Sequence, residues 1–99
     1  MRLWPRKLTK KNALTRLLYN LEYEGFVVGH DHDGYGRPVY DKLRNLLGHV
    51  DNTACFTYVR KHQAVPAVHR IIEIVRQLRR QGLAVSLSDG GKLPVDTAA

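Results

Sequence analysis

The 99-residue chain has one cysteine, few acids and no long apolar run, and each shortage narrows the classes of protein to which it can belong. Its single cysteine, Cys55, cannot close a disulfide within the chain, so a reducing compartment is the simplest location. No apolar run approaches the roughly 20 residues that a transmembrane helix needs. The basic start is not followed by the apolar segment that a signal peptide requires. The sequence therefore predicts a cytoplasmic protein with no membrane partner.

Acids are outnumbered, since nine Asp and Glu stand against 16 Lys and Arg, for a formal net charge of +7. The excess is uneven along the chain. Residues 1–20 hold six bases and no acid, residues 21–51 hold six acids against three bases, and residues 52–99 hold seven bases against three acids. If folding brings the two basic ends together, they form a cationic surface of the kind that binds phosphates. The alternative is that these side chains only solvate the surface.

Common catalytic motifs are missing: the chain has no P-loop, nucleophile elbow, zincin signature or paired metal-binding cysteines. An enzyme is therefore the third interpretation, in which a small nuclease or toxin would use histidines as general acid and base. His30 and His32 would share one face of a strand and could begin a zinc site, but the sequence identifies no third ligand. We predict a polar hairpin rim there, with no metal and no cofactor.

What the sequence does contain is one unit that occurs twice. Residues 13–41 and residues 67–96 each read as an amphipathic helix ending at a Gly, an apolar strand, a Gly-rich turn and a return strand. One such unit cannot bury its apolar face, whereas two units can share a core. The sequence thus predicts a single α+β domain over residues 13–96, with an antiparallel sheet packed by two main helices. A basic arm over residues 1–12 and a frayed tail over residues 97–99 flank this domain.

Local signals complete the expected secondary structure. Thr9 or Asn12 is predicted to cap the first helix, and Pro66 to open the second. A short helix is expected over residues 41–48, because Asp41 can cap it and Gly48 can stop it. Residues 54–61 are rich in aromatic and β-branched side chains and predict a strand between the two units.

The stretch LTRLLYNLEYEGFVVGHDHDGYGRPVY, residues 14–40, resembles the last helix and wing of winged-helix DNA-binding proteins. The resemblance implies that the helix enters the major groove and that Arg37 on the wing contacts phosphate or the minor groove. It implies groove-facing roles for Thr15, Arg16, Tyr19 and Asn20. A winged helix has two further helices upstream, and only about a dozen residues precede this one, so the missing helices would come from the C-terminal half or from a second chain.

We predict a small, basic nucleic-acid-binding regulator, with a homodimer as one arrangement. Arg76 and Arg80, one helical turn apart, would join residues 60–61 in a phosphate-contacting stripe, with Tyr58 available for stacking. The full set of candidate contact residues is Lys7, Lys10, Lys11, Arg16, Asn20, Arg37, Arg60, Lys61, Arg76 and Arg80. The alternative is a non-catalytic protein-interaction module, such as an inhibitor or an accessory factor of a mobile element, that docks a partner on its sheet edges. Salt dependence distinguishes the two, because phosphate contacts weaken steeply as salt rises.

Overall fold

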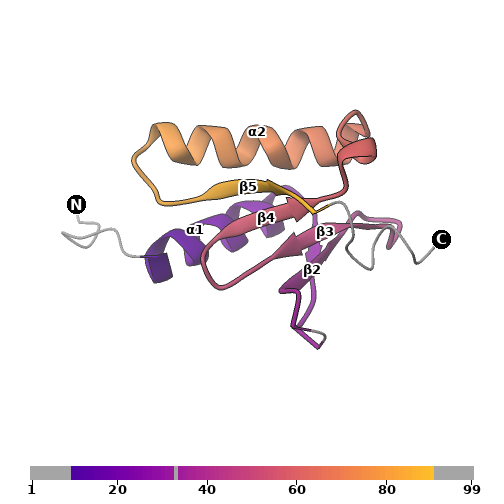
Figure 1. Ribbon diagram of the computed structural model, residues 1–99, viewed down its shortest axis with the longest axis horizontal. Helices are drawn as coiled ribbons and strands as arrows, with labels where there is room; N and C mark the ends of the chain where they lie inside the picture. The colour runs from indigo at the N-terminus through magenta and orange to yellow at the C-terminus, as the bar shows by residue number, and fades with distance from the viewer. Residues whose placement is uncertain (1–9, 33, 91–99) are drawn as a thin grey trace.

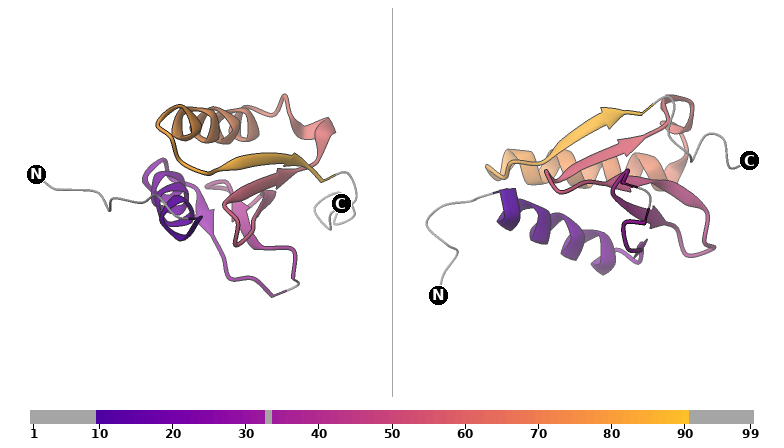
Figure 2. Two further views of the ribbon diagram at one scale, coloured as in Figure 1. Left: turned by 60° about the vertical axis from the view of Figure 1, so that its left-hand side comes forward. Right: turned by 60° about the horizontal axis from the view of Figure 1, so that its bottom comes forward.

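The computed structural model describes residues 10–32 and 34–90, and within them two α-helices cover one face of a five-stranded sheet (Figure 1). The elements are α1 (Lys10–Tyr23), β1 (Val27–Val28), β2 (Arg37–Tyr40), β3 (Leu46–Val50), β4 (Cys55–Tyr58), a 3₁₀ turn η1 (Arg60–His62), α2 (Pro66–Arg80) and β5 (Ser86–Asp89). The strands lie side by side in chain order. Both helices pack on the same side of the sheet, as the left view of Figure 2 shows. The predicted α+β class and its two main helices are confirmed.

Both helices end as the sequence predicts, at glycines that adopt a positive φ. Gly25 has a φ of +97° and Gly82 a φ of +91°. After α1, the N–H of Phe26 donates to the carbonyl of Leu21, and after α2 the N–H of Leu83 donates to the carbonyl of Leu78. These are the bonds of a Schellman motif, which satisfies the last carbonyls of a helix and needs a residue that tolerates the left-handed conformation. Each glycine thus turns the chain back onto the sheet.

The start of α1 excludes one of the two predicted caps. The helix begins at Lys10, so residues 10–12 belong to it and not to an arm. Asn12 lies inside the helix and is not its N-cap, and Thr9 lies outside the described residues. Lysine is a good helix former, which explains why the helix extends beyond the first apolar residue. Pro66 is the first residue of α2, as predicted.

The helix predicted over residues 41–48 is wrong, because this segment forms a turn followed by β3. The carboxylate of Asp41 accepts hydrogen bonds from the backbone N–H groups of Leu43 and Asn45 at 2.8 Å each. Such local bonds compete with helix formation. Arg44 has a φ of 70°, which breaks any helix, and Leu43 is 81% exposed, so the apparent leucine stripe is not a buried face.

The second unit also differs from the first. β1 and β2 form the predicted antiparallel hairpin, with Val28 opposite Val39. β5, in contrast, pairs in parallel with β4, with Phe56 opposite Leu87. The intervening α2 carries the chain back along the sheet, so β5 starts from the same end as β4. The sheet is therefore mixed, with one parallel pair, and the predicted return strand at residues 92–95 lies outside the described residues.

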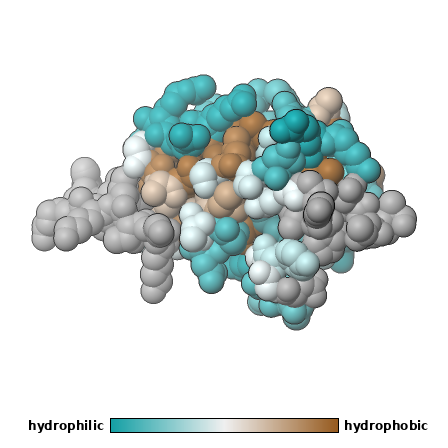
Figure 3. Space-filling model, viewed as in Figure 1, coloured by the Kyte–Doolittle hydropathy of each residue, from teal (hydrophilic) through white to brown (hydrophobic). Residues whose placement is uncertain are grey.

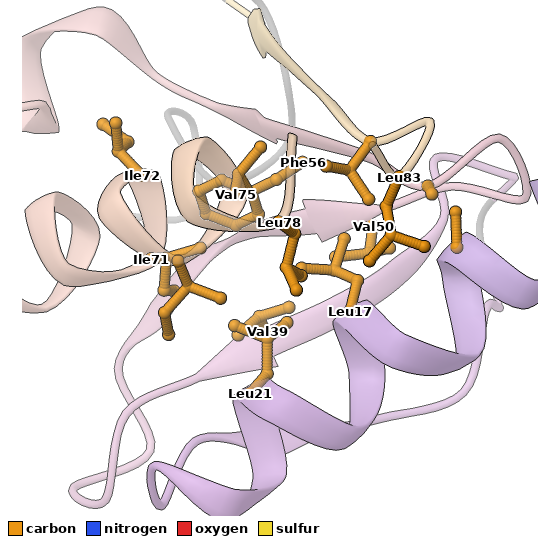
Figure 4. Close-up of a cluster of buried hydrophobic side chains, with 14 of the residues drawn as sticks. Leu17, Leu21, Val39, Val50, Phe56, Ile71, Ile72, Val75, Leu78 and Leu83 are labelled. Atoms are coloured by element: carbon orange, nitrogen blue, oxygen red, sulfur yellow. The ribbon is translucent and has the colours of Figure 1, made fainter. Parts of the chain in front are cut away.

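The core fills the space between the helices and the sheet (Figure 4). Leu17 and Leu21 of α1 point toward Val39 of β2, and side chains of α2 approach from the other side. The fully buried side chains, at less than 2% exposure, include Phe56, Leu17, Leu21, Ile71, Val39, Val50, Val68 and Val75. The apolar stripes predicted on both helices are the faces that form this core. Neither described helix is long and apolar enough to cross a membrane.

Candidate nucleic-acid interface

The first and last basic segments of the described chain meet at one end of the helical layer. α1 and α2 run in opposite directions, so the start of α1 lies beside the end of α2 in Figure 1 and in the right view of Figure 2. Across this junction Arg16 Nη2 donates a hydrogen bond to Gln81 Oε1 at 3.0 Å. We call this region the basic end and define it by Arg16, Arg76, Arg79 and Arg80. Lys10 and Lys11 form the first turn of α1 there.

Three arginines of the basic end form no ion pair with a described acid. They are Arg76, Arg79 and Arg80, and all three are exposed. Arg76 and Arg80 line a shallow surface groove with Glu73 and Gln77. Glu73 is engaged on the side away from them, where its carboxylate lies 3.2 Å from His69 and 3.5 Å from Arg70. Hydrophilic side chains cover the upper edge of the molecule along α2 (Figure 3).

The opposite end of the helical layer is neutralised. Glu24, just after α1, accepts two hydrogen bonds from Arg70 of α2, at 3.1 Å from Nε and 2.8 Å from Nη2. The hydrogen bonds and the positive charge of Arg70 hold the pKa of Glu24 below its ordinary value, and Glu24 raises the pKa of Arg70 in return. Arg70 is therefore occupied by a carboxylate, whereas the arginines further along α2 are not. The positive charge of the helical layer is concentrated at the basic end.

Helix dipoles explain part of this arrangement. Arg79 and Arg80 lie in the last turn of α2, where the partial negative charge of the helix end favours cations in any protein. The helix end therefore accounts for Arg79 and Arg80 without any ligand.

The structure does not bring the whole predicted stripe together. Arg60 and Lys61 lie in η1, which leads into the start of α2, while Arg76 and Arg80 are near its end. With a rise of about 1.5 Å per residue, α2 separates them by roughly 20 Å. Arg60 also forms an ion pair with Asp89 at 2.6 Å. Tyr58, which was predicted to be available for stacking on bases, instead packs on the ring of Phe56 in the core, with ring centroids 5.9 Å apart.

Of the remaining candidate contact residues, two form hydrogen bonds within the protein and one lies outside the described residues. Arg37 Nε donates to the carbonyl of Gly29 at 2.9 Å, which ties β2 to the chain after β1. Asn20 Nδ2 donates to the carbonyl of Arg16 at 2.7 Å, within its own helix. Lys7 lies outside the described residues. Both hydrogen bonds give these side chains a structural role, so neither needs a ligand to explain it.

Sequence reasoning did not identify one exposed aromatic residue on α1. Tyr23 is 77% exposed, and its ring stacks on that of Tyr19, which is 63% exposed, with centroids 6.2 Å apart and planes at 25°. The two tyrosines follow Arg16 by seven and three residues, so all three lie on one side of α1. The sequence did contain a signal for this pair, because two tyrosines spaced i,i+4 on the polar face of a predicted helix lie next to each other.

Histidines gather on the other face of the sheet. His30 and His32 contact edge to face, with centroids 6.4 Å apart, and line a hollow together with Tyr40 and the buried His49. His49 lies opposite Pro38 in the ladder, so it alternates away from the core-facing Val50. No group of three or more His, Cys, Asp or Glu among the described residues is placed to hold a metal ion.

Fold and surface together define a small α+β domain with a cationic end on its helical layer. The chain matches no family model, no curated protein and no solved structure. The winged-helix resemblance of residues 14–40 stays a prediction: α1 followed by the β1–β2 hairpin has the implied local order, which a helix packed on a hairpin has in many folds.

Proposed function

We propose that the protein binds nucleic acid and that Arg76 and Arg80 of the basic end contact its phosphates. The observation that supports this most directly is the group of exposed arginines on α2 that no described acid pairs with, at the junction where basic α1 begins. Arginine suits this role because its planar guanidinium can donate two parallel hydrogen bonds to a phosphate. Each phosphate that it neutralises releases a condensed counterion, and this release drives association.

A regulatory role, a cytoplasmic location and assembly as a homodimer are part of the same proposal. A dimer would place two basic ends on one nucleic acid, which raises the effective affinity without any new contact. Sedimentation velocity at several protein concentrations measures the assembly directly. A single species at the mass of the monomer, both free and bound, would remove the homodimer from the proposal and leave phosphate binding intact.

The alternative, docking of a protein partner, has one observation in its favour. Leu43 is 81% exposed in the turn between β2 and β3, and it borders a hollow that Phe26 and Ala67 also line. Exposed apolar side chains around a depression are typical of protein contacts. This surface lies at the end of α1 that carries Glu24, away from the basic end, so substitutions can separate the two functions.

The decisive experiment compares two double variants of equal charge. Fluorescence anisotropy would follow binding to labelled duplex DNA, single-stranded DNA and RNA over a series of salt concentrations. We expect the variant with Arg76→Ala and Arg80→Ala to bind at least tenfold more weakly. The slope of log affinity against log salt should become shallower by about 0.7–0.9 for each lost phosphate contact.

The control is the variant with Arg60→Ala and Lys61→Ala, which removes the same charge from the far end of α2. We expect its affinity to stay close to that of the unmodified protein. Equal weakening in both variants would show that net charge, not the basic end, drives binding. Absence of binding to all three probes at low salt would overturn the proposed function.

A further inference from the structure

Two exposed tyrosine rings lie on α1, one and two helical turns after Arg16 of the basic end. Aromatic side chains normally bury most of their large apolar surface, yet Tyr19 and Tyr23 remain 63% and 77% exposed. Their rings lie with centroids 6.2 Å apart and planes at 25°. The pair therefore presents two neighbouring aromatic surfaces to solvent.

The position of the pair is fixed by contacts at both ends of α1. Arg16, on the same side of the helix, bonds to Gln81 at the end of α2. Glu24, which follows Tyr23, bonds to Arg70 of α2. Both contacts cross from this side of α1 to α2. The tyrosine pair thus extends along α1 from one turn after Arg16, whose partner Gln81 follows Arg80 in the chain, toward the end of the helix that leads to Glu24.

We infer that the nucleic acid is single-stranded and that its unpaired bases stack on Tyr19 and Tyr23 while Arg80 and Arg76 hold its phosphates. This inference rests on the proposed function and names the form of nucleic acid that it binds. In a duplex the faces of the bases are covered by their neighbours and only their edges are accessible in the grooves. In a single strand the faces are free, and stacking on aromatic side chains beside a basic surface is the common way to bind it.

One polar residue of α1 also favours a single strand. Glu22 is exposed on this helix, and in a major groove its carboxylate would approach the phosphates that flank the groove on both sides. A single strand can pass over the rings and the arginines and avoid this carboxylate. The inference therefore differs from the duplex docking that the winged-helix resemblance implies.

The test uses the full chain, a labelled 12-nucleotide oligo(dT) and a 12-base-pair duplex, with anisotropy measured across salt concentrations. The unmodified protein should bind the single strand more tightly than the duplex. The variant with Tyr19→Ala and Tyr23→Ala should lose about tenfold or more in affinity for oligo(dT), since each stacked base contributes to binding. Its salt slope should not change, because the phosphate contacts remain.

Two further variants make the result specific. Tyr19→Phe with Tyr23→Phe keeps both rings and should retain the affinity for oligo(dT), which separates stacking from a hydroxyl hydrogen bond. Tyr35→Ala removes a tyrosine that is 47% exposed beside His49 on another part of the molecule, and it should bind as the unmodified protein does. Circular dichroism on each variant establishes that the fold is retained.

Either of two outcomes overturns the inference while the proposed function stands: tighter binding of the duplex, or unchanged oligo(dT) affinity after removal of both rings. In both cases the arginine double variant would still weaken binding. Failure of the unmodified protein to bind any probe at low salt overturns the proposed function, and the inference with it. The two failures are thus distinguishable.

Discussion

Gly48 occupies the tightest position among the described glycines. A Cβ at this position would lie 2.8 Å from the ring of Phe56 and would also meet the backbone carbonyl of Thr57. Backbone cannot move aside as a flexible side chain can. We expect Gly48→Ala to lower the free energy of unfolding by roughly 1–3 kcal/mol, the range for overpacked cores, as measured by urea denaturation.

Gly34→Ala is the matched control for this prediction. Nothing lies within 4 Å of a Cβ at Gly34, although its φ of +83° disfavours any side chain, so this change should cost only about 1–2 kcal/mol through the left-handed backbone. A larger loss in Gly34→Ala than in Gly48→Ala would contradict the view that close packing against Phe56 is what requires Gly48.

Residues whose roles depend on distant partners are the ones that sequence reasoning missed. Gly48 was predicted to stop a helix, because nothing in its neighbourhood reveals that Phe56 of the next strand packs against it. Arg60 was predicted to contact phosphate, but its partner Asp89 is 29 residues away. Arg16 and Arg80 were predicted as parts of one nucleic-acid-binding surface, and this stays a prediction. The structure joins Arg16 to Gln81, the residue after Arg80, because two helices that share a core lie side by side.

The contact between Glu24 and Arg70 joins the end of α1 to α2 and should depend on pH. Because Arg70 lowers the pKa of Glu24 from its ordinary value of about 4.5, the folded state favours the ionised carboxylate. Its stabilising effect is complete above the unfolded-state pKa and is lost as the pH falls through the lowered pKa. We expect Glu24→Gln to have a lower Tm than the unmodified protein at pH 7, and this difference to shrink as the pH falls below 4.5 toward 3.

Glu22→Gln gives the comparison, since Glu22 is exposed on the same helix and forms no ion pair with another described residue. Thermal unfolding of both variants over the same pH range should show a pH-dependent difference for Glu24→Gln only. A difference for Glu24→Gln that stays undiminished at pH 3 would mean that the side chain stabilises the helix junction through packing, not through its charge.

Among the elements, those with strong periodicity were predicted correctly and those that depend on pairing were not. Both helices have an apolar stripe and a terminal glycine, and each signal lies within the helix itself. β3 has the sequence LLGHV, which lacks the alternation of a half-buried strand. Four of its five residues are buried, because the strand lies between β2 and β4 in the sheet. The direction of β5 likewise depends on where α2 returns the chain, which no local pattern contains.

At the scale of the whole molecule, the separation of charge follows from the topology. Glu22 lies in the last turn of α1 and the other described acids of residues 21–51 follow in loops, whereas the basic end lies where α1 begins and α2 ends. A net charge of +7 spread evenly would attract any polyanion weakly. Positive charge that is concentrated at one end would instead orient a bound polyanion. Nucleic-acid affinity should therefore respond more to the position at which a charge is changed than to the total net charge.

Two neutralising substitutions test this directly, because each raises the net charge by one. Glu73→Gln removes the acid that lines the groove with Arg76 and Arg80, and we expect it to tighten nucleic-acid binding by roughly 1.5- to 5-fold at low salt, the effect of a partly screened surface charge. Asp89→Asn instead releases Arg60 at the far end of α2, and we expect no change. If Asp89→Asn tightened binding as much as Glu73→Gln did, the total charge would govern affinity. If it alone tightened binding, the interface would lie at Arg60, and the phosphate contacts would have to be reassigned to that end of the molecule.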